Sequence, residues 1–567
     1  MRMNRASLRA SAFICGLLLF AAAAAAAKPP GYACATAHPL ATQACMGILA
    51  DGGNAFDAAV AASAALAVVE PTGSGLGGGG FWLLHRVSDG VEVFVDGRET
   101  APGRAHRDMY LDAQGKVDPA RSRDGVLAAA IPGEPAALDH IARRYGSKPI
   151  AELLAPAIAY ARDGFAVDAK LAAAIERHRD RLSWAAQKVF VPDGTPLAQG
   201  ALLRQADLAW TLEQLARHGR DGFYEGAVAE RLLLAMERTQ GLWSATDLAR
   251  YAVVERAPLV TTFRGYRIVS SPPPSAGGVA LAQVFQQLEV LGWRDDGSAQ
   301  AQHMLIESLR RAYRDRAEYL GDPDFVPIPL MRLSGRSHAL QLARSIDPLR
   351  ATPSRSLPPA PVWREGSDTT HLSVLDAQGN RVAATLSINL PFGSGFMAPA
   401  TGVLLNDEMD DFAAAPGVAN AYGLVGSEPN AVAPHKRPLS SMTPTFVEGP
   451  RGLLVIGTPG GSRIITMVIQ GILGWIGGLD AEAIVALPRL HHQYLPDAVQ
   501  LEPDYADAVR RDALSAMGHT LLVTDYRWGN MQVVSWDPDA DRVQAASDPR
   551  GVGSARVQRL EPVATAP

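Results

Sequence analysis

The most distinctive chemical candidate in the sequence is Thr369, which stands where an irregular stretch of chain gives way to a strand pattern. A threonine hydroxyl is a weak nucleophile near neutral pH and needs a base to take its proton. If the Asp368–Thr369 bond is cut, the new α-amino group of Thr369 lies beside its own hydroxyl. Because an unperturbed α-amine has a pKa of about 7.7–8.0, part of it is neutral and can act as that base. One cut would therefore create both nucleophile and base.

Polar side chains on the two predicted strands that follow the cut are candidates to support Thr369. Ser387 and Asn389 are two residues apart, so both point to one face of their strand, and Thr369, His371 and Ser373 likewise share a face. We expect the Ser387 hydroxyl to hold the amine or hydroxyl of Thr369. The ordinary alternatives are a turn or a solvent-facing site for Ser387 and Asn389, and a plain strand position for Thr369, since threonine is favoured in strands.

An acidic cluster at 406–412, with the sequence Asn-Asp-Glu-Met-Asp-Asp-Phe, suits the binding of a cationic ammonium group. A solvated charged loop and a helix N-cap are the alternatives. Calcium is a weaker option, because the ligand spacing of a calcium-binding loop is absent.

Two further segments carry groups that suit an anion. Ser440 and Ser441 place adjacent hydroxyls in an apolar setting, which is also compatible with a turn. The glycine-rich stretch 457–463 follows a predicted strand and opens a predicted helix, where backbone N–H groups favour negative charge. It lacks the Gly-Lys-Ser/Thr ending of a phosphate-binding loop. In an enzyme that forms tetrahedral intermediates, this geometry is an oxyanion hole.

The elements that must position these groups are strands, helices and one linker. Residues 351–368 contain four prolines and three serines and read as an exposed linker, and a β-hairpin then runs over 369–375 and 382–389. A linker that enters a hairpin directly can be cut without unravelling the fold. We predict further strands at 81–84, 91–95, 266–269, 453–456 and 521–523 and near Phe446, and helices at 55–69, 203–215, 228–236, 279–291, 303–319 and 463–476. Strand pairs with helices outside them indicate layered α+β packing.

Composition narrows the functional classes. Apolar residues make up 47% and charged residues 20% of the 567-residue chain, which is enough for one large unit or two to four domains. With a net charge of −5 and no basic stripe, nucleic-acid binding is not expected. There is no His-Glu-x-x-His or Cys-x-x-Cys spacing and no dinucleotide fingerprint around the glycine run 77–80, so no metal site and no cofactor are expected.

Residues 1–27 have the pattern of a signal peptide: an arginine-containing head, an apolar stretch from Ala10 to Phe20 and small residues before Lys28. A retained membrane anchor is the alternative. We expect a periplasmic or secreted protein with no membrane attachment after signal removal. In that compartment Cys34 and Cys45 either form a disulfide or remain as two buried thiols.

With these motifs in view, the sequence resembles the gamma-glutamyltransferase (gamma-glutamyl transpeptidase) family of N-terminal-nucleophile hydrolases. The resemblance covers nearly all of the mature chain, and its specificity comes from many segments in family order: 51–55, 77–81, 98–102, 272–278, 319–323, 369–374, 406–412, 438–442, 459–463 and 547–550. It implies a four-layer αββα sandwich and self-cleavage before Thr369. The products would be a large chain, 28–368, and a small catalytic chain, 369–567, that stay together.

The resemblance also implies roles in substrate binding and catalysis. Arg98 matches the arginine that binds the substrate α-carboxylate, assisted by Ser440 and Ser441. Asn389, Glu408 and Asp411 match residues around the α-amino group. Gly460 and Gly461 match the glycines of the oxyanion hole. The residues agree with this reading, because a gamma-glutamyl group ends in a zwitterion that needs a cation and an anion close together, and arginine binds a carboxylate in bidentate geometry.

The implied activity is hydrolysis or transfer of gamma-glutamyl groups, with glutathione and related compounds as donors and water, amino acids or dipeptides as acceptors. One rival is a related acylase for glutaryl or cephalosporin side chains, which Asp411 argues against because a glutaryl group has no ammonium. Another is an inactive homologue that only binds gamma-glutamyl compounds. The sequence departs from the family at Ser387, where threonine is usual, and at Leu390-Pro391. The stretch 416–425, with Tyr422, resembles a bacterial lid loop.

Overall fold

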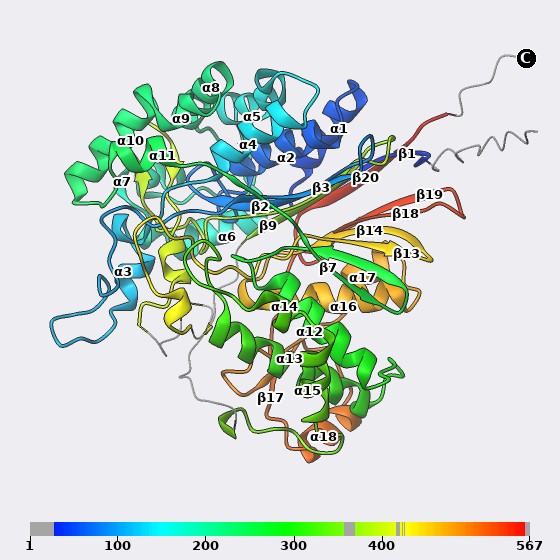
Figure 1. Ribbon diagram of the computed structural model, residues 1–567. Helices are drawn as coiled ribbons and strands as arrows, with labels where there is room; N and C mark the ends of the chain where they lie inside the picture. The colour runs from blue at the N-terminus through cyan, green and yellow to red at the C-terminus, as the bar shows by residue number, and fades with distance from the viewer. Residues whose placement is uncertain (1–27, 357–368, 416–419, 422, 425, 562–567) are drawn as a thin grey trace, which may run out of the picture.

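The computed structural model describes residues 28–356, 369–415, 420–421, 423–424 and 426–561. The predicted signal segment, Asp368 and Tyr422 therefore lie outside the described residues. The predicted α+β class is confirmed: two large antiparallel sheets face each other, and helices lie on the outer side of each (Figure 1). In the described part of the chain, no helix combines the length and apolar character needed to cross a membrane.

The first sheet has the predicted hairpin at its centre. Its strands, in spatial order, are β20 (Ser554–Arg559), β1 (Gly31–Thr36), β9 (Thr370–Leu375), β10 (Arg381–Ser387), β2 (Gly79–Arg86), β3 (Val91–Gly97) and β6 (Val254–Arg256). Alternation along β2 decides which face each side chain takes: Trp82 and Leu84 pack against the outer helices, whereas Phe81 and Leu83 face the second sheet. Thr369 thus enters the middle of a sheet that is buried on both faces.

Helices from the first half of the chain cover the outer face of this sheet. They are α1 (Pro39–Ala50), α2 (Ala55–Val69), α4 (Glu134–Arg144), α5 (Ile150–Asp163), α8 (Ala206–His218), α9 (Asp221–Tyr224), α10 (Gly226–Thr239) and α11 (Ala245–Arg250). All residues of α2 are buried, which its many alanines permit by letting neighbouring elements approach closely. A capping box between Asn54 and Asp57 begins this helix at the predicted residue.

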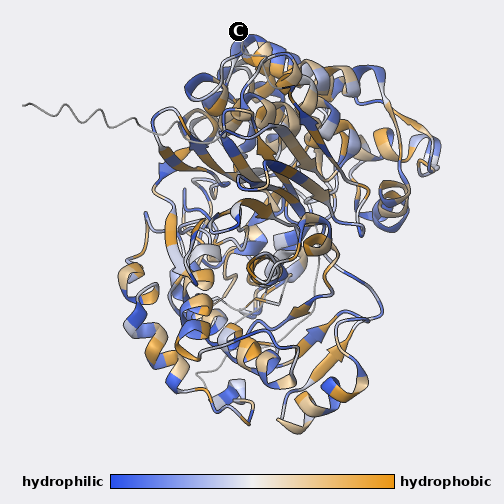
Figure 2. Cartoon of the chain, turned by 90° about the vertical axis from the view of Figure 1, so that its right-hand side faces the viewer, coloured by the Kyte–Doolittle hydropathy of each residue, from blue (hydrophilic) through white to orange (hydrophobic). Residues whose placement is uncertain are grey.

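The second sheet brings together strands from both halves of the chain. Its order is β19 (Arg542–Ser547), β18 (Gln532–Asp537), β14 (Gly452–Gly457), β13 (Thr445–Gly449), β8 (Tyr266–Ser270) and β7 (Leu259–Phe263). The helices on its side are α12 (Gly277–Val290), α13 (Ala299–Tyr319), α14 (Leu330–Leu333), α15 (Arg336–Arg344), α16 (Ile464–Ile476), α17 (Ala481–Ala486) and α18 (Ala508–Ala516). Hydrophobic residues gather on the strands in the middle of the molecule, whereas the outer helices mix both kinds (Figure 2).

The remaining helices and strands are short. They are α3 (Pro119–Arg123), α6 (Ala169–His178), α7 (Trp184–Phe190), β4 (Phe165–Ala166), β5 (Leu202–Leu203), β11 (Met397–Ala398), β12 (Val403–Leu404), β15 (Leu490–His491), β16 (Val499–Leu501) and β17 (Leu521–Val523). Of the two alternatives for Cys34 and Cys45, the structure has the disulfide, which links β1 to α1. Sequence analysis predicted neither β1 nor its partner β20.

Candidate active site

Thr369 lies directly before β9, opposite the end of β10. Leu386 pairs with Thr370, and continuing this antiparallel register by one residue sets Ser387 against Thr369. The hydroxyl oxygens of Thr369 and Ser387 are 3.3 Å apart, within hydrogen-bonding distance. Ser387 Oγ also accepts a hydrogen bond from the Asn389 backbone N–H at 2.8 Å. The predicted contact between Ser387 and the nucleophile candidate is therefore present.

His371, two residues after Thr369, does not act on it. Its ring lies between the two sheets, with Nδ1 at 2.8 Å from Thr385 Oγ1 and Nε2 at 3.3 Å from Ser373 Oγ. Burial lowers the pKa of His371 to about 3, so the ring is neutral near neutral pH. A Cβ at Gly457 would lie 2.2 Å from this ring, so the facing strand must carry glycine there. His371 is a packing residue, and the base for Thr369 has to come from elsewhere.

Arg98 follows β3 and is almost completely buried, with three carboxyl groups around it. Its Nη1 lies 2.6 Å from Glu408 Oε2 and 3.3 Å from Glu99 Oε2, and its Nη2 lies 2.5 Å from Asp411 Oδ2. Its Nε donates to the Pro438 carbonyl at 3.2 Å. Glu408 and Asp411 belong to a single 3₁₀ turn, 408–411, so one short turn supplies two of the three carboxyl groups. The acidic cluster is not a solvated loop.

One guanidinium cannot neutralise three carboxylates. Burial raises the pKa of Glu99 well above its usual value, and the nearby Glu408 raises it further. Burial also raises the pKa of Glu408 to about 7, against the opposing effect of Arg98. Although burial alone would lower the pKa of Arg98, the carboxylates raise it above its normal range, so this side chain stays charged. Glu408 Oε1 has no hydrogen-bond partner among the described residues and remains available as an acceptor.

A small cavity joins this charged group to Thr369. Nine of the predicted site residues line it: Arg98, Thr369, Ser387, Asn389, Glu408, Asp411, Ser440, Ser441 and Gly461. Leu424, Met442 and Ile464 complete the lining with apolar surface. The side-chain Nδ2 of Asn389 donates to the Asp407 carbonyl at 3.0 Å. The volume open inside the cavity is only about 20 Å³, so its own charged side chains nearly fill it.

Ser440 and Ser441 reach the cavity from the segment before β13. The Ser440 backbone N–H donates to Pro274 at 2.8 Å, and its carbonyl accepts from Ala276 at 2.9 Å, so the serine pair is held against the start of α12. The Ser440 hydroxyl accepts from the Met442 N–H at 3.1 Å. Both serines are buried and neither lies in a turn, so the alternative prediction of a turn is wrong.

Gly460 and Gly461 lie between β14 and α16, as predicted for an oxyanion site. Both have positive φ, 140° and 55°, which favours glycine at each position. A Cβ at Gly460 would also lie 2.5 Å from Met467 Cε. Gly461 lines the small cavity, and Gly460 lines a second hollow that also reaches Thr369. Their backbone N–H groups begin the turn that leads into α16, where a helix N-terminus favours developing negative charge.

Comparison with known proteins decides the family. The model of the gamma-glutamyltranspeptidase family matches residues 41–557. The chain belongs to the gamma-glutamyltranspeptidase family. It is 42% identical over 526 residues to the glutathione hydrolase proenzyme of Escherichia coli K12, covering 91% of this chain and 90% of that protein. It is 36% identical over 525 residues to the acylase ACY 1 proenzyme of Pseudomonas sp. strain SE83, covering 90% and 91%.

The solved structures agree with this family assignment. The cephalosporin acylase from Bacillus halodurans superposes with a TM-score of 0.82 at 27% identity, covering 94% of this chain and 96% of that chain. The chain thus has the scaffold of a solved acylase and is similar in sequence to both a glutathione hydrolase proenzyme and an acylase.

Arg316 is a site-adjacent residue of this gamma-glutamyltranspeptidase family member that sequence analysis missed. It lies near the end of α13, is buried, and its Nη2 donates to Ser441 Oγ at 3.3 Å. Burial lowers its pKa to about 10, which still leaves it charged near neutral pH. Arg316 thus adds a second cation behind the serine pair. Helical periodicity places it on the buried face of α13, but the sequence gives no sign that this face meets Ser441.

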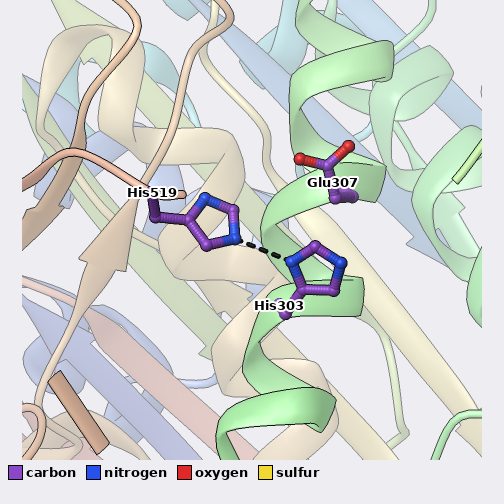
Figure 3. A group of neighbouring side chains, drawn as sticks. All are labelled: His303, Glu307 and His519. Atoms are coloured by element: carbon purple, nitrogen blue, oxygen red, sulfur yellow. Dashed lines mark hydrogen bonds between the residues drawn. The ribbon is translucent and has the colours of Figure 1, made fainter. Parts of the chain in front are cut away.

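Two groups outside this site have the residue types of a metal centre among the described residues, His85 with Glu92 and Glu448, and a fully buried one. His303, Glu307 and His519 lie together, with His303 Nδ1 and His519 Nε2 2.8 Å apart (Figure 3). Glu307 already accepts from Arg311 at 2.6 Å and from Arg310 at 3.1 Å. Two guanidinium groups beside the carboxylate oppose the binding of a cation, so we assign this group to packing between α13 and the segment before β17.

Proposed function

We propose that this protein cuts itself before Thr369 and then hydrolyses or transfers gamma-glutamyl groups, with Thr369 as nucleophile. The observation that carries the proposal is that one cavity holds Thr369 together with the cation Arg98 and the carboxyl groups of Glu408 and Asp411. A gamma-glutamyl donor combines an amide that a nucleophile can attack with a zwitterion that needs both charges. The 42% identity to a glutathione hydrolase proenzyme supports the same substrate class.

The chain as proposed forms the four-layer αββα sandwich of an N-terminal-nucleophile hydrolase from two fragments, 28–368 and 369–567. The strand order supports fragments that stay together after cleavage. In the first sheet β9 and β10 lie between β1 and β2, and in the second sheet β13 lies beside β8. Each sheet therefore contains strands from both sides of the cut, and separating the fragments would expose both hydrophobic cores.

In the proposed reaction the free Thr369 amine takes the proton of the Thr369 hydroxyl, whose oxygen attacks the gamma carbonyl carbon. Ser387, 3.3 Å from that hydroxyl, holds it in position. The backbone N–H groups of Gly460 and Gly461 stabilise the oxyanion of the tetrahedral intermediate. Loss of the amine leaving group gives an ester on Thr369, and water or an acceptor amine then releases the glutamyl group.

In this proposal, the two charges of the substrate zwitterion replace ion pairs that already exist between side chains of the cavity. In the proposed complex, the substrate α-carboxylate pairs with Arg98 and accepts from Ser440 and Ser441, while Arg316 adds positive charge behind Ser441. The α-ammonium group of the substrate forms ion pairs with the carboxyl groups of Glu408 and Asp411. Asn389 holds Ser387 through its backbone N–H and holds the acidic turn through its Nδ2, which donates to the Asp407 carbonyl.

The related acylases are the alternative that the scaffold itself allows. A glutaryl side chain would leave the charge of Asp411 unpaired, and burial makes an unpaired charge costly. Asp411 therefore favours a donor that carries an α-ammonium group. We also propose that Tyr422 is a lid residue for this donor.

We also propose that 1–27 is a signal peptide and that the mature protein works in the periplasm or outside the cell. The Cys34–Cys45 disulfide supports this, because such bonds persist in oxidising compartments.

Mass spectrometry of the purified protein, combined with an assay on gamma-glutamyl para-nitroanilide, tests the proposal. We expect a fragment whose first residue is Thr369 and release of nitroaniline. A fully active protein that remains one unbroken chain across 368–369 would refute the mechanism. A cut protein that hydrolyses glutaryl but not gamma-glutamyl anilide would favour the acylase alternative.

A further inference from the structure

A buried carboxylate that the proposed mechanism does not use lies one residue away from Thr369. Glu70 directly follows α2 and is only 5% exposed. Its Oε2 accepts a hydrogen bond from the Thr370 hydroxyl at 2.6 Å, and its Oε1 pairs with Lys170 Nζ at 3.0 Å. A short hydrogen bond from a hydroxyl to a carboxylate is among the stronger ones in proteins. Glu70 does not line the small cavity in which the charged groups meet Thr369, so its role there must be indirect.

The hydroxyls of Thr369 and Thr370 point to opposite faces of the first sheet, because side chains alternate along a strand. Thr369 Oγ1 lies 3.3 Å from Ser387 Oγ, on the side of the small cavity. Thr370 Oγ1 instead reaches Glu70 at the end of α2, which covers the outer face of the sheet. The peptide group that joins 369 to 370 is therefore held by a hydroxyl contact on each face.

The strand pairing shows why this end of β9 needs support from outside the sheet. The register of β9 against β10 reaches Thr370, whereas its register against β1 already ends at Leu372. The turn that follows Glu70 lies against the unsupported end: a Cβ at Gly73 would lie 3.3 Å from the Thr369 carbonyl oxygen and equally far from Glu70 Oε2. The Gly73 N–H donates to the Glu70 carbonyl at 2.9 Å, which ties this turn to the end of α2.

We propose that Glu70 is a positioning residue for the nucleophile: by holding the Thr370 hydroxyl it fixes the 369–370 peptide and so aims the Thr369 hydroxyl at the gamma carbonyl of the donor. The inference rests on the proposed function. Cleavage removes the covalent connection on the N-terminal side of Thr369, so the position of this chain end then depends on contacts such as this one. Lys170, from α6, holds the carboxylate of Glu70 from its other oxygen.

Two substitutions of similar size at Glu70 test this assignment. Glu70→Gln keeps an oxygen that can accept from Thr370, whereas Glu70→Met does not. Turnover of gamma-glutamyl para-nitroanilide is expressed per cut chain, with the cut fraction taken from intact mass. We expect kcat of Glu70→Met to fall roughly tenfold or more, within the hundredfold that a displacement of about 1 Å can cost. KM should change little, because Glu70 does not line the small cavity, and Glu70→Gln should keep most of kcat.

The donor of the hydrogen bond gives a second, independent pair of variants. Thr370→Ser keeps the hydroxyl and should keep most of kcat, whereas Thr370→Val should lose as much as Glu70→Met. In the double variant Glu70→Met with Thr370→Val, the Thr370 hydroxyl and its acceptor are both replaced by apolar groups, so thermal stability should recover relative to each single variant. Its kcat should nevertheless stay as low as that of the single variants, because none of the three proteins can form the positioning bond. If Glu70→Met does not fold, the Thr370 pair decides.

Thr211→Val is the matched control. Thr211 is a fully buried threonine in α8 whose hydroxyl donates to the Thr401 carbonyl at 2.7 Å, so this variant should lose stability but keep kcat. The inference would be overturned by an unchanged kcat in Glu70→Met or Thr370→Val, by an equal loss in Glu70→Gln, by recovery of kcat together with stability in the double variant, or by the same kcat loss in the control. Any of these results with a cut and active wild-type protein would leave the proposed function standing, whereas a wild-type protein that is not cut or does not hydrolyse the anilide would refute both.

Discussion

Arg98 Nη2 lies 2.5 Å from Asp411 Oδ2 in the cavity that Thr369 also lines. The two residues are far apart in sequence, and each would be a costly buried charge without the other. The charged groups that are proposed to bind a zwitterion are thus paired with each other in this structure. In the proposed complex, substrate binding would exchange this internal pair for two new ones, which would lower the cost of keeping charged groups in a nearly closed cavity.

The Asp411→Ala variant tests this exchange. It should still cut itself, because Asp411 does not contact Thr369, but turnover of gamma-glutamyl anilide should fall by roughly a hundredfold or more. Truncating one partner of a buried charge pair typically costs about 2–5 kcal/mol. Steady-state kinetics measures the loss, and the exposed Glu428→Gln substitution serves as a control. Unchanged turnover in Asp411→Ala would move the ammonium site elsewhere.

In the proposed scheme, self-cleavage depends on the hydroxyl of Thr369. The Thr369→Ala variant should remain one chain under denaturing conditions, whereas Thr369→Ser, which keeps a hydroxyl, should still be cut. Electrophoresis and intact mass show this directly. Ser373→Ala is a matched control, because Ser373 is a buried hydroxyl on the same strand that donates to the Gln532 carbonyl. Efficient cutting of Thr369→Ala would contradict the scheme.

In the proposed mechanism, Ser387 determines how firmly the nucleophile Thr369 is held. Its hydroxyl contacts Thr369 without the γ-methyl group that would restrict its χ1 rotation. Ser387→Thr should therefore speed maturation, and Ser387→Ala, which removes the contact, should slow it. A time course of fragment appearance after synthesis measures both rates. Equal rates in all three proteins would show that this hydroxyl does not take part.

The local parts of this site could be predicted from the sequence. Alternation over 369–375 and 382–389 predicted β9 and β10, and the position of Ser387 opposite Thr369 follows from the register of that one hairpin. The helix over 55–69 was predicted at its observed ends, because its alanine-rich sequence has strong helix propensity. Local periodicity and helix propensity were sufficient for these elements.

The contacts between segments that are far apart in the sequence could not be predicted from local sequence patterns. Nothing in the sequence indicates that β20 pairs with β1 or that Arg316 reaches Ser441. The positions of Arg98, Asp411 and Ser441 around Thr369 were inferred from family resemblance, not from spacing. The surroundings of Arg98 also could not be read from residue types, since the observed contact of three carboxyl groups with one guanidinium depends on how the 408–411 turn packs.

Glu134 predicts a pH dependence of stability that is separate from catalysis. Burial raises its pKa from 4.5 to about 8, with the Gly75 backbone opposing this rise. Between these two pH values the folded protein holds a proton that the unfolded chain releases, so this group makes stability fall as pH rises through that window. Glutamine has nearly the same shape and does not titrate, so Glu134→Gln should gain stability over the wild-type protein as pH rises, by about 1.4 kcal/mol for each pH unit inside the window. Denaturation midpoints measured from about pH 5 to about pH 8, with the exposed Glu482→Gln as control, would give a widening difference for Glu134→Gln alone; a constant difference would show that Glu134 is ionised in the folded protein throughout.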